Sequence, residues 1–171
     1  MSYKDTYVIF NEENDLWAYE KMKGYVTNDK IDFSFYDAHD IKSLVQTESE
    51  ESIKKQVGKR LAKASQAIVI IGDNDKNFSQ FFRWEIEVVL KRDLPIIAIN
   101  LNNKRRIDND RCPSILKDKY VVHVPLEMKI IKYALENFPE EYFASASHLE
   151  GPRYYNDDIY HQLGLSPSKS S

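Results

Sequence analysis

Short apolar runs alternate along the chain with segments whose apolar positions recur at helical spacing. Runs rich in β-branched and aromatic residues are typical of strands, and they occur at residues 7–10, 32–36, 67–71, 94–101 and 120–124. The intervening segments are long enough to cross over as helices, so the strands are expected to be parallel. The pattern therefore predicts an α/β fold of the flavodoxin-like, doubly wound kind, with a five-stranded parallel sheet in the order 2-1-3-4-5.

Helix boundaries follow from capping residues. Asn14 or Asp15 is expected to cap a first helix that ends near Gly24. A polar loop is expected over residues 37–48, and Ser49-Glu50-Glu51-Ser52 resembles a capping box that opens the next helix. Two further helices with apolar stripes are expected, at residues 78–92 and 127–138.

The third apolar run, residues 67–71, is typical of a strand that is buried on both faces. Glu85 lies on the helix that follows, among the aromatic residues Phe81, Phe82 and Trp84. Ligands of open α/β sheets bind at the carboxyl edge, where this helix begins. Glu85 is therefore a candidate catalytic carboxylate, and the alternative is a solvated residue on an amphipathic helix.

Polar side chains follow the first two strands at the same edge. Asn11 follows the first strand, and Asp37, His39 and Asp40 follow the second. Because the carboxyl ends of parallel strands meet at one edge, these residues and Glu85 could line one cleft. Asp37 and Asp40 are equally residue types that loops use in turns and caps.

Composition sets the class of protein. The chain has 171 residues, of which 42% are hydrophobic and 30% charged, which suits a globular domain with a core. The net charge of −3 does not indicate binding to nucleic acid or to an anionic membrane. No apolar run approaches the ~20 residues of a membrane span. The first residues lack the apolar core of a signal peptide, so a cytoplasmic protein is expected. Residues 1–138 are expected to form the domain, and residues 139–171 an extension that packs on it and ends in flexible residues.

Metal and dinucleotide-fingerprint chemistry has no motif to support it. GxGxxG, GxxxxGK[ST] and HExxH are all absent. The single cysteine, Cys112, rules out an internal disulfide and a cysteine-based metal cluster. The four histidines are widely spaced, so no metal site is predicted, and His123 is expected to be a core residue with its hydrogen bonds satisfied.

Five segments, taken in order, resemble the TIR-like family. They are Tyr7-Val8-Ile9-Phe10, residues 32–40, Ile68-Val69-Ile70-Ile71-Gly72, Arg83-Trp84-Glu85-Ile86-Glu87 and residues 95–101. More narrowly, about residues 5–135 resemble the TIR-like proteins of bacterial Thoeris anti-phage defence. Glu85 falls where TIR enzymes carry their catalytic glutamate, and Ser79 and Phe81 fall where many of them have a serine and a tryptophan. The loop that begins at Asn11 departs from the more usual serine-bearing pattern.

The resemblance implies an enzyme that breaks the nicotinamide–ribose bond of NAD. In such a reaction the anomeric carbon passes through an oxocarbenium-like state as neutral nicotinamide leaves. A single carboxylate that offsets the developing positive charge suffices, and this is the role implied for Glu85. NAD is then a substrate, no cofactor is expected, and the product is an ADP-ribose-type signal in cyclic form. The implied substrate-binding residues are Phe10, Asn11, Asp37, His39, Asp40, Phe81 and Trp84.

Two other hypotheses stay open at the level of the sequence. One is a non-catalytic TIR-like interaction module, in which Glu85 is a helix-surface residue. The other is a nucleoside deoxyribosyltransferase-like enzyme, which uses a sheet-edge carboxylate in a similar fold. For the NAD-cleaving enzyme, the resemblance implies self-association on activation, because residues 38–46 correspond to the BB loop that completes a neighbour's site. It also implies a separate effector, which the nucleotide messenger reaches.

Overall fold

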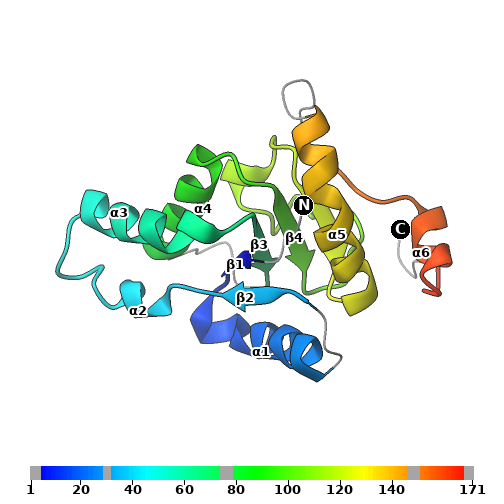
Figure 1. Ribbon diagram of the computed structural model, residues 1–171, viewed down its shortest axis with the longest axis horizontal. Helices are drawn as coiled ribbons and strands as arrows, with labels where there is room; N and C mark the ends of the chain where they lie inside the picture. Colours follow the sequence, from blue (N-terminus) through cyan, green and yellow to red (C-terminus); the bar gives the residue numbers. More distant parts are fainter. Residues whose placement is uncertain (1–4, 29–31, 74–78, 146–150, 168–171) are drawn as a thin grey trace.

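The computed structural model describes residues 5–28, 32–73, 79–145 and 151–167 of the chain. Within these residues, five parallel strands form one sheet in the order β2-β1-β3-β4-β5 (Figure 1). The strands are β1 (Asp5–Ile9), β2 (Ser34–Tyr36), β3 (Gln66–Ile71), β4 (Ile96–Asn100) and β5 (Val122–Pro125). The predicted flavodoxin-like sheet and its strand order are confirmed.

Helices cover both faces of this sheet (Figure 1). One face carries α1 (Glu12–Asn28) and α5 (Met128–Ser145), and the other carries α3 (Glu50–Arg60) and α4 (Gln80–Lys91). The short α2 (His39–Lys42) follows β2, and α6 (Asp157–Gln162) lies beyond α5. Every residue of β3 is buried, and its side chains alternate between the two cores, with Val69 in the α3/α4 core and Ile68 in the α1/α5 core. The positions of the residues that follow β1, β2 and β3 are therefore fixed by a sheet that is packed on both faces.

The first helix begins earlier than the sequence predicts. Asn11, rather than Asn14 or Asp15, caps it, because Asn11 Oδ1 accepts the backbone N–H of Glu13 at 3.1 Å. The carbonyl oxygen of Asn11 also accepts the N–H of Asp15 at 2.8 Å. An asparagine at this position satisfies N–H groups that have no partner inside the helix.

The same helix also ends later than predicted, at Asn28 rather than near Gly24. Met22 is fully buried and Tyr25 packs against the same core. Burial of these side chains outweighs the roughly 1 kcal/mol that a glycine costs within a helix.

Helix α5 continues through Pro139 to Ser145, whereas the apolar pattern predicted an end at Phe138. Proline has no N–H and leaves the carbonyl four residues earlier without its helical partner. That carbonyl belongs to Leu135, and it accepts a hydrogen bond from the side chain of Gln66 at 3.4 Å. The helix therefore continues past residue 138, the predicted end of the domain, while the Leu135 carbonyl keeps a hydrogen bond.

The segment after α5 packs its aromatic residues against the α1/α5 core. Tyr155 is 5% exposed and Tyr160 is 1% exposed. The guanidinium of Arg105 lies over the ring of Tyr160, 4.0 Å from its centroid. Residues 168–171, part of the end expected to be flexible, lie outside the described residues.

His123, on β5, is fully buried as expected, but its hydrogen-bonding was predicted wrongly. Neither Nδ1 nor Nε2 has a hydrogen-bond partner within the residues that the structure describes. Burial lowers the pKa of His123 to about 4, so the ring is neutral at neutral pH.

Candidate active site

Glu85 lies on α4, which begins just beyond the carboxyl end of β3. Ser79 caps this helix by accepting the N–H of Phe82 on its hydroxyl at 3.1 Å, while Phe78, the start expected from the sequence, lies outside the described residues. The apolar stripe of α4 packs on the sheet and carries Glu85 inward with it, so Glu85 is only 2% exposed. A glutamate is almost never buried to this extent without a partner.

The partner of Glu85 is Tyr7, which the sequence analysis missed. The hydroxyl of Tyr7 donates a hydrogen bond to Glu85 Oε2, across 78 residues of sequence. Burial raises the pKa of Glu85 to about 8, although the Tyr7 hydrogen bond lowers it, and Asp37 raises it while Lys42 lowers it. Glu85 is therefore mostly protonated at neutral pH in this conformation.

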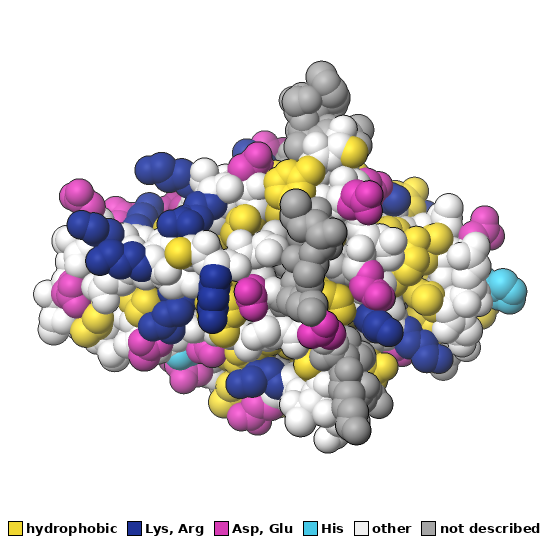
Figure 2. Space-filling view, viewed as in Figure 1, with side chains coloured by type: hydrophobic (Ala, Val, Ile, Leu, Met, Phe, Trp, Pro, Cys, Tyr) yellow, Lys and Arg dark blue, Asp and Glu magenta, His cyan; other side chains and the backbone are white. Residues whose placement is uncertain are grey.

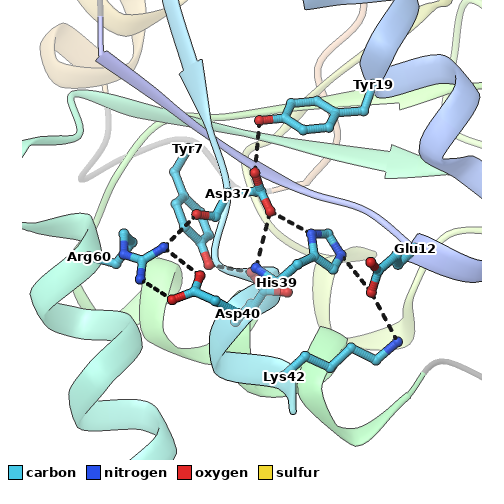
Figure 3. Close-up of polar contacts among 9 residues, drawn as sticks. Tyr7, Glu12, Tyr19, Asp37, His39, Asp40, Lys42 and Arg60 are labelled. Carbon is cyan, nitrogen blue, oxygen red and sulfur yellow. Dashed lines mark hydrogen bonds and ion pairs between the residues drawn. The ribbon is translucent and has the colours of Figure 1, made fainter. Parts of the chain in front are cut away.

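A second cluster forms around Asp37, directly after β2 (Figure 3). Asp37 Oδ1 accepts the hydroxyl of Tyr19 at 3.1 Å. Its Oδ2 accepts the backbone N–H of His39 at 3.1 Å and lies 2.6 Å from His39 Nδ1. The hydrogen bond from the His39 side chain is the largest cause of the low pKa of Asp37, about 2. Asp37 is thus a fixed negative charge near Glu85.

His39 points its other nitrogen toward α1. Nε2 lies 3.9 Å from a carboxylate oxygen of Glu12, and Lys42 Nζ lies 4.0 Å from the same oxygen (Figure 3). The ring of Phe10 packs on His39, with 4.3 Å between ring centroids. Because Asp37 occupies Nδ1, Nε2 is the nitrogen of His39 that remains for another group.

Arg60, at the end of α3, ties α2 to the rest of the domain. Its two terminal nitrogens contact the two carboxylate oxygens of Asp40 at 2.9 and 2.7 Å. One of these nitrogens also donates to the carbonyl oxygen of Asp37 at 2.9 Å. The arginine holds the pKa of Asp40 below its usual range. This bidentate contact, called here the Arg60 clamp, fixes the short helix that lies between Asp37 and α3 (Figure 3).

The structure places the candidate residues of the sequence analysis in three different roles. Asp37, His39, Asp40 and Phe10 form one polar and aromatic cluster beside Glu85. Asn11 serves as the cap of α1. Phe81 and Trp84, which are 3% and 6% exposed, belong to the α3/α4 core around Glu85. Asp40 also lines a cavity of about 620 Å³ between α2 and α3, together with Ile41, Leu44, Gln56, Lys59, Arg60, Ala62 and Lys63.

Tyr7, Tyr19 and Arg60 are the site residues that sequence reasoning missed. Only Tyr7 gave a local signal, because a tyrosine in a buried strand needs a partner for its hydroxyl. The partners of Tyr19 and Arg60 depend on packing between elements that are distant in sequence.

The surface over α3 and α4 is more basic than the net charge of −3 suggests. A groove of about 1030 Å³ between these helices is lined by Lys54, Lys55, Lys59, Lys91 and Arg92, with Glu51 and Glu87. Figure 2 shows lysine and arginine side chains gathered on this side of the molecule. The charge of Lys54 is partly neutralised by Glu87, whose Oε2 lies 2.5 Å from Lys54 Nζ.

Membrane-spanning helices and metal-binding clusters are absent from the described residues. None of the helices they form is long and apolar enough to cross a membrane. Within the same part of the chain, no group of three or more histidine, cysteine, aspartate or glutamate side chains is placed to hold a metal ion.

Comparison with known proteins identifies the family. No match was found among curated proteins. A family model described as "Thoeris protein ThsB, TIR-like domain" matches residues 7–106, a segment that holds Tyr7, Asp37, Arg60 and Glu85. Since this match covers more than half of the 171 residues, the chain belongs to the family of TIR-like domains of the Thoeris protein ThsB.

Proposed function

We propose that this protein cleaves NAD at the nicotinamide–ribose bond, with Glu85 as the catalytic carboxylate, and makes a cyclic ADP-ribose-type signal in anti-phage defence. NAD is a substrate here, and the proposal needs no cofactor. The observation that carries it is the enclosed carboxyl group of Glu85, held by Tyr7 close to the charge of Asp37 at the carboxyl edge of the sheet. Strongly raised pKa values at such an edge are typical of functional groups.

The chemistry follows from charge. The bond between the anomeric carbon and the nicotinamide nitrogen breaks, and its electron pair goes to nicotinamide, which leaves neutral. The positive charge moves onto the ribose, where a nearby carboxylate stabilises it most effectively in a dry site. Water then attacks the anomeric carbon and releases a proton, or a nitrogen of the adenine attacks and closes a ring.

The raised pKa of Glu85 suits a cationic substrate. Without substrate, Glu85 with a pKa of about 8 keeps its proton and costs little to bury. The positive charge of the nicotinamide ring would favour the ionised form, just as Lys42 does. Glu85 would then carry its negative charge only when the reacting bond is in place. Asp37, His39 and Asp40 are the groups proposed to hold ribose hydroxyls, and Phe10 the base.

The proposal includes a change in the segment after β2 that opens access to Glu85. Glu85 is 2% exposed, and the Arg60 clamp holds α2 in place next to it. Self-association is the proposed trigger that moves this segment, and a separate effector is the proposed receiver of the signal. This protein is therefore expected to be nearly inactive as a dilute monomer.

The test is NAD incubation at high protein concentration, with and without lysate of infected cells, followed by chromatography of nicotinamide and the ADP-ribose products. Glu85→Gln is expected to lower turnover by about two orders of magnitude or more, the scale of losing one preorganised electrostatic group. Glu87→Gln is the matched control, because Glu87 lies on the same helix and pairs with Lys54 and Arg83. Full turnover in Glu85→Gln would remove Glu85 from the mechanism.

A second candidate is a non-catalytic interaction module. Glu85 is buried rather than the helix-surface residue that this hypothesis expected, so its role there would be in packing. A carboxyl group that is 2% exposed and hydrogen-bonded by Tyr7 can serve packing alone. Absence of nicotinamide release under every activating condition would select this candidate.

A further inference from the structure

Tyr7 is held in place by contacts on both sides of β1. It is fully buried in β1 and pairs in register with Ala67 on β3 and Tyr36 on β2. The ring of Tyr36 meets it edge-on, with 5.5 Å between centroids. Backbone pairing on both sides and a ring contact therefore fix where the hydroxyl of Tyr7 lies.

Glu85 has no backbone partner that sets the orientation of its carboxyl group. The terminal torsion of a glutamate is broad, so a hydrogen bond can decide the plane in which the carboxyl group lies. The hydroxyl of Tyr7 bonds to Oε2 and supplies the missing restraint. In the proposed reaction, Oε1 is then the oxygen left for the ribose.

We propose that Tyr7 is a positioning residue, which holds the Glu85 carboxyl group through Oε2 and so presents Oε1 to the ribose. This inference rests on the proposed NAD cleavage. Tyr7 does not touch the reacting atoms, and it acts only through Glu85. A hydrogen bond donated to a carboxylate also favours the ionised form, which is the form that the reaction needs.

A role in packing alone predicts different results from a positioning role. Loss of a buried hydroxyl's hydrogen bond lowers stability whatever its partner does. Loss of the hydrogen bond to Glu85 changes how readily Glu85 ionises in either case. Only a positioning role also changes how fast bound substrate reacts. Tyr7→Phe separates the two, because it keeps the ring contact with Tyr36 and removes only the hydroxyl. Tyr160→Phe is the control for losing a buried hydroxyl in the other core, since Tyr160 is equally buried but lies in the extension. The Tyr160 hydroxyl has no hydrogen-bond partner within the described residues, so this control does not reproduce the loss of a hydrogen bond.

The first measurement needs no enzymatic activity. Glutamate labelled with ¹³C at the side-chain carboxyl is incorporated, the Glu85 resonance is assigned by its loss in Glu85→Gln, and its pKa is measured by NMR titration. Tyr7→Phe is expected to raise the pKa of Glu85 by about one pH unit or more, because the carboxylate loses a donor. Tyr160→Phe is expected to leave it unchanged. An unchanged pKa in Tyr7→Phe would overturn the inference, whatever the protein does to NAD.

The second measurement is turnover across pH. Tyr7→Phe is expected to lower kcat about tenfold, with KM within about twofold, and to move the rising limb of the pH profile to higher pH. In a Glu85→Gln background, Tyr7→Phe should have no further effect on kcat, since its only route is through Glu85. A raised pKa with unchanged kcat would overturn the positioning role. No turnover by the wild-type protein would instead overturn the proposed function, and with it the catalytic part of this inference.

Discussion

The carboxyl group of Asp15, on α1, lies directly against Gly72 at the end of β3. A Cβ added at Gly72 would come within 2.5 Å of Asp15 Oδ1. Asp15 is 4% exposed, and its Oδ2 has no hydrogen-bond partner within the described parts of the chain. Burial, with a further contribution from Asp73, raises the pKa of Asp15 to about 6. This contact sets the spacing of α1 and β3 at the point where the strand order of the sheet reverses.

Gly72→Ala is expected to destabilise the protein by about 1–3 kcal/mol, because the added methyl group overpacks this contact. Chemical denaturation measures the change. Gly24→Ala is the matched control, since nothing lies within 4 Å of its added Cβ. Alanine inside a helix should stabilise the control by about 0.5–1 kcal/mol. Equal stability of Gly72→Ala and the wild type would show that α1 shifts to accommodate the methyl group without a change in the free energy of unfolding.

Glu85→Gln is expected to change how stability depends on pH. The folded-state pKa of about 8 is raised from 4.5, so the wild type holds full stability from this group below pH 4.5 and loses it as pH rises through 8. Glutamine does not titrate. The stability of Glu85→Gln relative to wild type should therefore increase between pH 5 and pH 8, by on the order of 1–3 kcal/mol.

Thermal melting at several pH values tests this expectation, with Glu87→Gln as the comparison. Glu87 is partly exposed and paired with Lys54, and its pKa is lowered, so its replacement should show no such gain on raising the pH. A constant difference between Glu85→Gln and wild type from pH 5 to pH 8 would mean that Glu85 is ionised and solvated in the folded protein.

His123 is expected to weaken the fold in mild acid. Burial lowers its folded-state pKa from 6.5 to about 4, so the unfolded chain binds the proton more readily. The contribution of His123 to the free energy of unfolding is fully present above pH 6.5, where the ring is neutral in both states. It is lost as the pH falls toward 4. Denaturation measured across pH should show no such loss of stability in His123→Leu. His161→Gln, at an exposed position, should lose stability in acid as the wild type does. Identical acid sensitivity in wild type and His123→Leu would show that the pKa of His123 is not lowered in the folded protein.

Arg60→Gln is expected to loosen the segment after β2, because it breaks the Arg60 clamp on Asp40 and on the Asp37 carbonyl. The ion pair is partly exposed, so the effect is modest, and amide hydrogen exchange over residues 38–44 should speed up about two- to fivefold. Lys59→Gln, one residue earlier in α3, is the control. Equal exchange in the two variants would show that the clamp adds nothing to the packing of α2.

Local signals were enough to predict the sheet and to place Glu85 on the helix that follows its third strand. The β-branched run of β3 and its alternation with helices define the topology, whereas the cap of α4 at Ser79 lies one residue after the start predicted at residue 78. The chemical state of Glu85 could not be predicted this way. Its hydrogen-bond partner, Tyr7, is 78 residues away in sequence, and a glutamate on an amphipathic helix is usually solvated.

The Arg60 clamp and the course of α5 were missed for a related reason. Nothing in the sequence distinguishes Arg60 from the other basic residues of α3 until α2 is packed beside it. Proline is normally expected to end a helix, and only the position of Gln66 in the folded chain provides the hydrogen bond that lets α5 continue.

Pro139 has a consequence for where this protein can be divided. The bond from Gln66 to the Leu135 carbonyl ties the first residue of the central strand to the middle of the last long helix. The turns after Pro139 carry Tyr142, whose ring stacks on Tyr120 next to β5. A chain cut after residue 138 would lose half of that ring stack and leave apolar surface of β5 open to water. The extension and the sheet therefore share one hydrophobic core, and a cut at Pro139 is expected to destabilise the sheet as well as remove the extension.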